Sequence, residues 1–236
     1  MELGKLYLIP TTLGDNEPLE VLPISIKRII EQVDFYIAEN EKSARRFIKK
    51  VSSGKSQPDL NFQLLNKFTE EAEIHTYLDP CLRGEHIGLM SDAGYPGVAD
   101  PGADIVSLAH SKGIKVVPLV GPSSILMAMI ASGMNGQNFA FNGYLPIDKS
   151  DRKSEIKKFE KRSKEFNQSQ IFIETPYRND KLLADFTSYL NDTTRLCVAC
   201  DITLPEEYIK TQTIADWKKT KIELHKRPCI FILHKN

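Results

Sequence analysis

The sequence carries no excess charge of either sign. Lys and Arg together number 31 among 236 residues, and Asp and Glu also number 31. This balance excludes a global electrostatic attraction to nucleic acid or to an anionic membrane, although a local basic patch stays possible. No apolar run is long enough to span a bilayer, and the first residues lead into a strand pattern rather than a signal-peptide pattern. We therefore expect a cytoplasmic protein that does not bind membranes.

Cysteine and histidine are scarce. Four cysteines are scattered among apolar residues, and the five histidines show no metal-ligand spacing. Cys197 and Cys200 have the C-x-x-C spacing of redox and metal sites, but no second pair accompanies them. Along a strand, this spacing would place the two side chains on opposite faces of the sheet. We therefore expect buried, reduced cysteines and no metal site.

Phosphate-binding motifs are missing as well. The Gly-Lys-Ser/Thr ending of a P-loop is absent, and no G-x-G-x-x-G string follows the first predicted strand, residues 5–9. Phosphate cradling by a glycine-rich loop is therefore not expected. A nucleotide-like ligand without a triphosphate suits the chain better.

The first part of the chain alternates strand and helix patterns. Apolar runs of strand length alternate with segments of helical periodicity. Such an alternation predicts an α/β domain with a mostly parallel, doubly wound sheet. The predicted strands are residues 5–9, 33–38, 62–66, 86–90, 114–119 and 139–146, and the predicted helices are 19–31, 42–51, 70–82, 103–110 and 125–132.

A short polar and charged stretch, residues 147–154, is the expected domain boundary. The first domain then covers residues 1–146 and the second covers residues 147–236. Consecutive strands without a full crossover predict a mixed sheet in the second domain. Its predicted helices are residues 155–167, 179–190 and 214–219, and its predicted strands are 170–174, 195–201, 207–212 and 229–233.

Three of the predicted strands run into loops built from Gly, Pro and small residues. These loops cover residues 10–15, 91–102 and 120–124. In open α/β sheets, ligands bind beyond the carboxyl ends of the strands. Loops that are poor in bulky side chains let a small molecule reach backbone amides and carbonyls. We therefore expect these loops to form a ligand site, although a tight strand-to-helix turn without a ligand is the simpler alternative for any one of them.

The residues of these motifs, and the order in which they occur, resemble those of a known family. The motifs stand at residues 6–14, 38–40, 91–102, 120–124, 132–133, 141–146 and 174–178. Over residues 5–218 they are similar to the tetrapyrrole (corrin/porphyrin) methylase superfamily. Within it, they resemble most the branch of ribosomal RNA small subunit methyltransferase I, which methylates a cytidine ribose 2′-hydroxyl.

The resemblance implies an S-adenosylmethionine-dependent methyltransferase, a homodimer with a ligand cleft between its two domains. Carried over residue by residue, it implies cofactor contacts at Pro10, Asp92, Ala93, Gly94, Tyr95, Leu119, Val120, Gly121 and Ser123, with Ala199 and Pro228 closing the cofactor cleft. Ribosomal RNA or the small ribosomal subunit would be the partner.

The chain departs from this branch where substrate contacts are expected. The branch has Arg-Glu-Leu-Thr-Lys where this chain has residues 200–204, Cys-Asp-Ile-Thr-Leu, so two cations are missing. Phosphate contacts dominate RNA affinity. Methylation of a tetrapyrrole or another small molecule, and a catalytically silent cofactor-binding protein, are therefore alternatives.

Three carboxylates at predicted strand ends are candidates for removing a proton from the acceptor. They are Glu39, Asp92 and Glu174. The alternative for each is a structural role, as a turn acceptor for Asp92 and as an ion pair with Arg178 for Glu174. Candidate substrate contacts are Arg45, Tyr177 and Arg178. The basic run at residues 42–50 is either an RNA-facing surface or a solvated helix face.

Overall fold

The computed structural model describes residues 2–236 and divides between Ser123 and Ser124 into two compact units, each with its own sheet. Among the described residues, no helix combines the length and the apolar composition needed to cross a bilayer. Each unit is described separately below.

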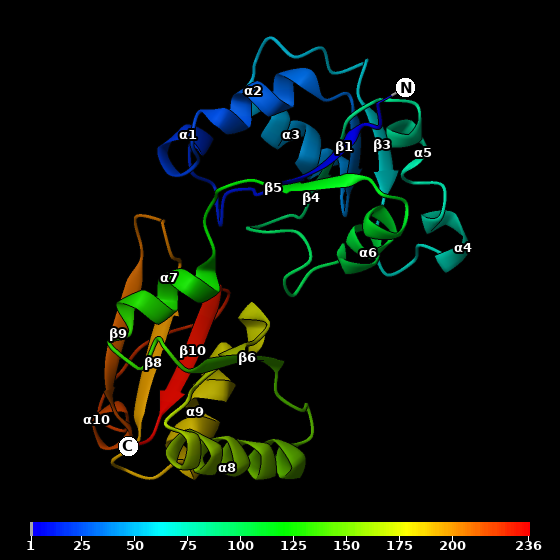
Figure 1. The fold of residues 1–236 in the computed structure, drawn as a ribbon. Helices are drawn as coiled ribbons and strands as arrows, with labels where there is room; N and C mark the ends of the chain where they lie inside the picture. Colours follow the sequence, from blue (N-terminus) through cyan, green and yellow to red (C-terminus); the bar gives the residue numbers. More distant parts are fainter. Residues whose placement is uncertain (1) are drawn as a thin grey trace. The chain divides into compact units, whose positions relative to one another are not determined.

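The first unit is built on a five-stranded parallel sheet (Figure 1). Its strand order is β3-β2-β4-β1-β5, and all neighbouring pairs in the register are parallel. The strands are β1 (Lys5–Ile9), β2 (Phe35–Ala38), β3 (Asn61–Leu64), β4 (Ile87–Met90) and β5 (Lys115–Pro118). The predicted parallel sheet is therefore confirmed.

Both faces of this sheet are buried against helices. Alternate residues of one strand enter different cores, as Leu6 and Tyr7 do. One core includes α2 (Ser25–Gln32) and α3 (Glu41–Val51), and the other includes α5 (Asp79–Leu82) and α6 (Ala103–Ser111). This arrangement is the predicted doubly wound fold.

Two predicted helices are each split in the structure. Residues 19–31 form α1 (Pro18–Val21) and α2, because Pro23 cannot continue a helix and Leu22 before it is extended. Residues 70–82 form α4 (Glu71–Ile74) and α5, and Pro80 lies in the first turn of α5. Both segments are helical in part, as their periodicity predicted, but each contains a proline and forms two short helices instead of one.

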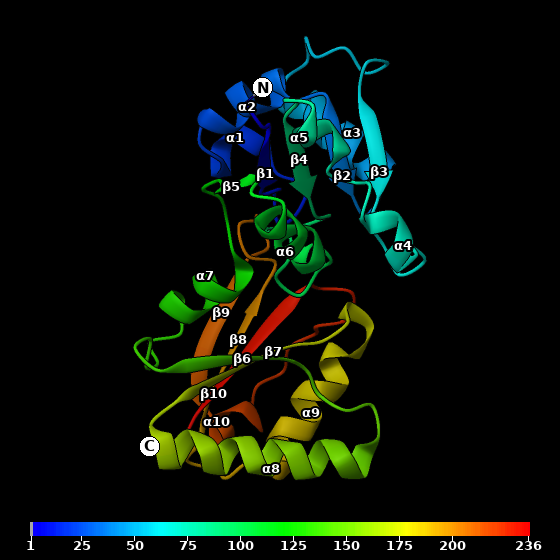
Figure 2. The same ribbon diagram turned by 45° about the vertical axis from the view of Figure 1, so that its right-hand side comes forward.

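The second unit carries a mixed five-stranded sheet of order β6-β7-β10-β8-β9 (Figure 2). The pair β6–β7 is parallel and the other three pairs are antiparallel, which confirms the predicted mixed sheet. The strands are β6 (Phe139–Tyr144), β7 (Ser169–Ile173), β8 (Arg195–Cys200), β9 (Tyr208–Thr213) and β10 (Cys229–His234). The helices are α7 (Ser124–Ala131), α8 (Lys149–Phe166), the 3₁₀ helix η1 (Pro176–Arg178), α9 (Asn179–Tyr189) and α10 (Ile214–Trp217).

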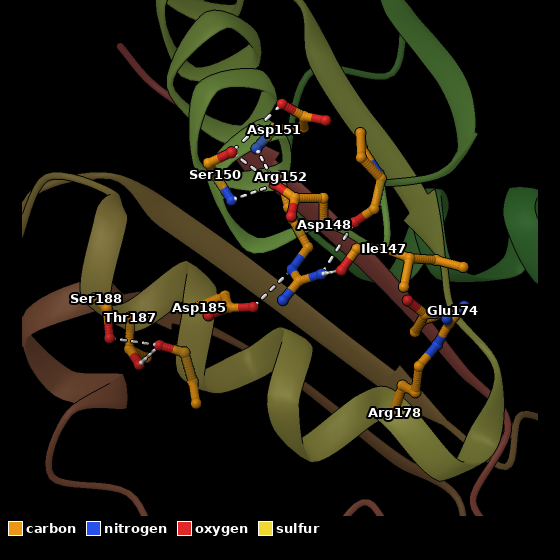
Figure 3. Close-up of polar contacts among 12 residues, drawn as sticks. Ile147, Asp148, Ser150, Asp151, Arg152, Glu174, Arg178, Asp185, Thr187 and Ser188 are labelled. Atoms are coloured by element: carbon orange, nitrogen blue, oxygen red, sulfur yellow. Dashed lines mark hydrogen bonds and ion pairs between the residues drawn. The ribbon is translucent and has the colours of Figure 1, made fainter.

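The structure divides the chain earlier than the expected boundary after residue 146. The helix α7 and the strand β6 belong to the second unit, where β6 pairs with β7. Residues 149–154, expected in a linker, form the first turns of α8 instead, and Asp148 accepts hydrogen bonds from the backbone of Ser150 and Asp151 (Figure 3). Polar residues suit a helix N-terminus as well as a linker, so composition could not separate the two.

A buried ion pair fixes the start of α8. The Nε of Arg152 lies 2.6 Å from the Oδ2 of Asp185 in α9, and its Nη1 donates to the carbonyls of Pro146 and Ile147 (Figure 3). Both side chains are buried, so each charge depends on the other for compensation. This network joins the two helices and the segment that precedes α8.

The four cysteines are buried and free, as expected from their apolar sequence surroundings. Cys197 and Cys200 do not pair with each other. Instead, Cys200 lies opposite Cys229 in the antiparallel register, and their sulfur atoms are 2.7 Å apart. Cys197 lies opposite Thr211 on the neighbouring strand β9.

Candidate functional site in the first unit

The three Gly/Pro loops meet at one edge of the parallel sheet. They follow β1, β4 and β5, which are adjacent in the order β4-β1-β5. The backbone amide of Thr11 in the first loop donates to the carbonyl of Gly94 in the second, at 2.9 Å. The hydroxyl of Thr11 also donates to the carbonyl of Ser91, at 3.3 Å. The expected convergence of the first two loops is therefore confirmed.

The side chain of Tyr95 joins the second loop to the third. Its hydroxyl donates to the carbonyl of Gly121 at 2.9 Å and accepts from the amide of the same residue at 2.8 Å. The resemblance implied a cofactor contact for Tyr95. Its hydroxyl holds the third loop in place, and any cofactor contact would come from the ring or the backbone.

Two glycines are required by the backbone at this edge. Gly121 lies so close to Pro10 that a Cβ atom there would be 2.3 Å from the Cγ of the proline ring. Gly94 has φ +77°, which side-chain-bearing residues rarely adopt, and a Cβ there would be 3.3 Å from the side chain of Leu13. The loops can approach one another this closely only because these positions lack side chains.

The same loops contain residues that a ligand can reach. Asp92 and Ala93 are exposed, and Val120 is 74% exposed although both of its neighbours are half-buried. Pro10 is buried against Gly121, so it shapes the loop more than it offers surface. The cofactor contacts that the resemblance implies remain predictions.

Three carboxylates gather beside these loops. Glu39 follows β2, while Asp92 and Asp100 belong to the loop after β4, the strand next to β2. The hydroxyl of Ser43 in α3 donates to the Oδ1 of Asp92 at 2.5 Å. The Oε1 of Glu39 is buried, and no described residue forms a hydrogen bond with it. Asp100 was not singled out from the sequence, because nothing in the chain shows that its loop turns back toward Glu39.

The pKa of Glu39 is raised to about 7, mainly by burial and then by the negative charges of Asp100 and Asp92, while a hydrogen bond from the Asp92 backbone acts in the opposite direction. Burial likewise raises the pKa of Asp100, with Asp92 as a second cause. A carboxyl that titrates near neutral pH is suited to accept a proton from a substrate. The raised pKa of Glu39 therefore suits the role of a base that was predicted for this residue.

A pocket of about 340 Å³ adjoins the loop edge. Asp92 and Ser91 form one side of it, and the helix α3 forms another. The first loop contributes Thr11, Thr12 and Asp15 to the lining, and α3 contributes Ser43, Arg46 and Lys50. The pocket therefore lies next to the backbone proposed to hold the cofactor.

The structure favours Arg46 over Arg45 as a substrate contact. Arg45 bonds Glu41 within α3 and the carbonyls of Gln57 and Leu60, and its guanidinium lies over the ring of Phe62. Arg46 is exposed and lines the pocket. Both belong to the same basic run, so only the rotation of the helix distinguishes them.

The candidate residues of the second unit form a separate group. Glu174 is buried and its Oε1 accepts from the amide of Thr175 and from the Nη2 of Arg178, at 2.5 Å from the latter (Figure 3). This geometry is the structural ion pair considered above as an alternative. Tyr177 is 69% exposed and its ring lies edge-on against His225.

The two predicted cofactor contacts of this unit differ in accessibility. Ala199 in β8 is fully buried, whereas Pro228 is exposed and its carbonyl accepts from the amide of Asp201. Pro228 is therefore the better candidate of the two. Among the described residues, no group of three His, Cys, Asp or Glu side chains is arranged to hold a metal ion.

Comparison with known proteins decides the family. Residues 5–218 match the family of Tetrapyrrole (Corrin/Porphyrin) Methylases. The chain belongs to this family. The predicted class, an S-adenosylmethionine-dependent methyltransferase, is confirmed by this membership and by relatives that are named as methyltransferases.

This methylase is similar to curated proteins named ribosomal RNA small subunit methyltransferase I. The protein from Bacillus subtilis is 32% identical over 210 residues, which cover 89% of this chain and 68% of the relative. The protein from Pasteurella multocida is 30% identical over 216 residues, covering 92% of this chain and 73% of the relative.

Solved structures share the fold. The methyltransferase CobJ has a TM-score of 0.65 at 13% identity, with 98% of this chain and 94% of that chain covered. The uroporphyrin-III C-methyltransferase from Thermus thermophilus, complexed with S-adenosylhomocysteine, has a TM-score of 0.57 at 16% identity, with 98% of each chain covered. The predicted two-unit α/β fold is therefore that of this family of methyltransferases.

Proposed function

We propose that this methylase transfers a methyl group to the 2′-hydroxyl of a cytidine ribose in small-subunit ribosomal RNA. The proposal is supported by the names of its relatives from Bacillus subtilis and Pasteurella multocida. The observation that carries it is Glu39, a carboxylate with a pKa near neutrality and an unpartnered oxygen beside the convergent loops. A ribose hydroxyl is a weak nucleophile, and its transfer step needs a group that accepts its proton. A ribosomal acceptor also implies a cytoplasmic location.

In such a transfer, some residues of the first unit would position the cofactor and another would accept the proton. Bound S-adenosylmethionine would supply a methyl group from its sulfonium centre and would leave as S-adenosylhomocysteine, whose sulfur keeps the electron pair of the broken S–C bond. The backbone of Asp92, Ala93 and Val120 would position the cofactor, and the hydrogen bonds of Tyr95 to Gly121 would hold the third loop in place. Glu39 would accept the hydroxyl proton as the ribose oxygen takes the methyl group, so that the proton ends on the carboxylate.

The acceptor is tested by offering the purified full chain three substrates with radiolabelled S-adenosylmethionine. We expect label in the RNA of small ribosomal subunits, intact or stripped of protein, and nuclease mapping should place it on a ribose. Label in a tetrapyrrole but not in RNA would contradict the proposal and support the small-molecule alternative. Cofactor binding without transfer to any acceptor would instead support a silent binding protein.

We also propose a homodimer in which the outer face of α7 contacts the second copy. Eight residues of this helix are almost all apolar, yet Ile130 is 83% exposed. Exposed apolar residues on one helix face are typical of a protein interface. We expect the wild-type chain to sediment as a dimer and Ile130→Glu to sediment as a monomer. Ile147→Glu, at another exposed isoleucine of the same unit, should stay dimeric. A monomeric wild-type protein would contradict this proposal.

A further inference from the structure

Two cations lie on the same face of α3, at the wall of the 340 Å³ pocket. Arg46 and Lys50 are four residues apart, so they are neighbours on the helix surface. Like charges at this spacing repel each other: the hydrogen bond to Asp15 raises the pKa of Lys50, and the charge of Arg46 opposes this rise as the smallest influence on that group. Such a pair is favourable mainly when an anion lies between or beside its members.

In this structure Asp15 takes the position of that anion. Its Oδ1 lies 2.7 Å from the Nζ of Lys50, and this hydrogen bond and charge lower the pKa of Asp15, with a smaller contribution from Arg46. The Asp15 side chain is 94% exposed and comes from the loop that follows β1. An exposed ion pair of this kind stabilises a fold little. A competing anion could therefore displace Asp15 without disturbing the fold.

The rest of the pocket is polar and leads toward the site of transfer. The hydroxyl of Thr12 donates to the carbonyl of Gly14, and that of Ser43 donates to Asp92, with the carbonyl of Asn40 as an alternative acceptor at 3.0 Å. Each hydroxyl is thereby oriented, and each oxygen keeps a lone pair for a donor on a ligand. Asp92 also lines this pocket, beside Ser43. A group bound at Arg46 and Lys50 would therefore share the pocket with the loop that follows β4.

We propose that Arg46 and Lys50 form a subsite for a backbone phosphate of the acceptor polynucleotide, and that this phosphate displaces Asp15. The subsite rests on the proposed function, because the phosphate belongs to the acceptor polynucleotide. A phosphate bound there would place its attached sugar in the pocket beside Asp92. It also supplies cations in the first unit that residues 200–204 of the second unit do not supply.

The subsite is tested by binding of a fluorescein-labelled, single-stranded oligocytidylate to the full chain saturated with S-adenosylhomocysteine, over a range of salt concentrations. Arg46→Gln and Lys50→Gln should each weaken binding roughly tenfold, and each should lower the slope of log affinity against log salt by about one. Asp15→Asn should tighten binding several-fold because it removes the competing carboxylate. The matched control is Lys49→Gln, an exposed lysine of the same helix that lies outside the pocket, and it should bind within about twofold of wild type.

The outcomes separate this subsite from the proposed function. If all four variants bind the oligomer with the affinity of the wild type, and the wild type methylates ribosomal subunits, the subsite is wrong and the proposed function stands. If the wild type neither binds the oligomer nor methylates ribosomal subunits, both are wrong. If inorganic phosphate at constant ionic strength protects Lys50 from amine modification while the variants leave oligomer affinity unchanged, the pocket binds free phosphate, and the polynucleotide assignment is overturned.

Discussion

Replacing Gly121 with alanine should reduce S-adenosylmethionine affinity by about two orders of magnitude, since misplacing a binding group by an ångström can have effects of this size. The added Cβ would lie 2.3 Å from the Cγ of Pro10, and a proline ring cannot move aside as a flexible side chain can. The third loop must therefore shift away from the first, and the backbone of Val120, next to Gly121, shifts with it. Isothermal titration calorimetry of the full chain measures the effect.

The matched control is Gly54→Ala, which adds the same methyl group at a glycine of the same unit with nothing within 4 Å of the new Cβ. It should bind the cofactor as the wild type does. Tyr95→Phe is the second variant, because it removes only the hydroxyl that bonds both backbone groups of Gly121. If Gly121→Ala fails to fold, Tyr95→Phe still tests the loop arrangement. Wild-type affinity in both variants would show that the third loop does not hold the cofactor.

Replacing Glu39 with glutamine should lower the rate of methyl transfer by about 10² to 10⁴-fold and leave cofactor affinity unchanged. A general base acts only when it is deprotonated. Because the pKa of Glu39 is raised to about 7, the wild-type rate should rise as the pH increases through 7 and level off above it. Glutamine cannot ionise, so the residual rate of the variant should lose this rise. Single-turnover rates with a ribosomal acceptor, measured across this range, give both quantities.

Glu20→Gln is the control for this experiment, since Glu20 is an exposed carboxylate of α1 outside the pocket and the loops. It should keep both the rate and the pH profile of the wild type. A Glu39→Gln variant with the wild-type rate and the same pH profile would exclude Glu39 as the base. A variant with lowered cofactor affinity would assign Glu39 to the binding of the cofactor instead.

The sequence predicted that the three loops lie at one edge of the sheet, because the carboxyl ends of parallel strands share one edge. That β4, β1 and β5 are neighbours in the sheet, which brings the loops together, is known only from the structure. The hydrogen bonds between the loops were not predictable. Tyr95 and Gly121 are 26 residues apart, and no local pattern indicates that a tyrosine hydroxyl bonds both backbone groups of a distant glycine.

For charged residues as well, contacts close in sequence were predictable and contacts distant in sequence were not. The Glu174–Arg178 pair could be predicted because its spacing of four residues lies within one short segment. The Asp15–Lys50 pair could not, because 35 residues and a strand separate its members. In the basic run of α3, the sequence shows several cations but not which of them the helix turns toward the pocket. The raised pKa of Glu39 depends on burial and then on Asp100, and only the folded structure defines both.

The boundary between the units was misplaced for a physical reason. The strand β6 follows a run of β-α units and has the composition of their next strand, yet it pairs with β7, beyond α8. Strand pairing depends on partners that are remote in sequence, so the local pattern could not assign β6 to a sheet.

A crystal structure with S-adenosylhomocysteine is the most direct test of the central claim, that loops after β1, β4 and β5 hold the cofactor through their backbone. Difference density is expected against the backbone of Asp92–Gly94 and Leu119–Gly121, with the Tyr95 hydroxyl still bonded to Gly121. Density elsewhere, such as in the separate pocket lined by His75 and Ser107 of the first unit, would contradict the claim, and so would crystals that take up no ligand while calorimetry detects no binding.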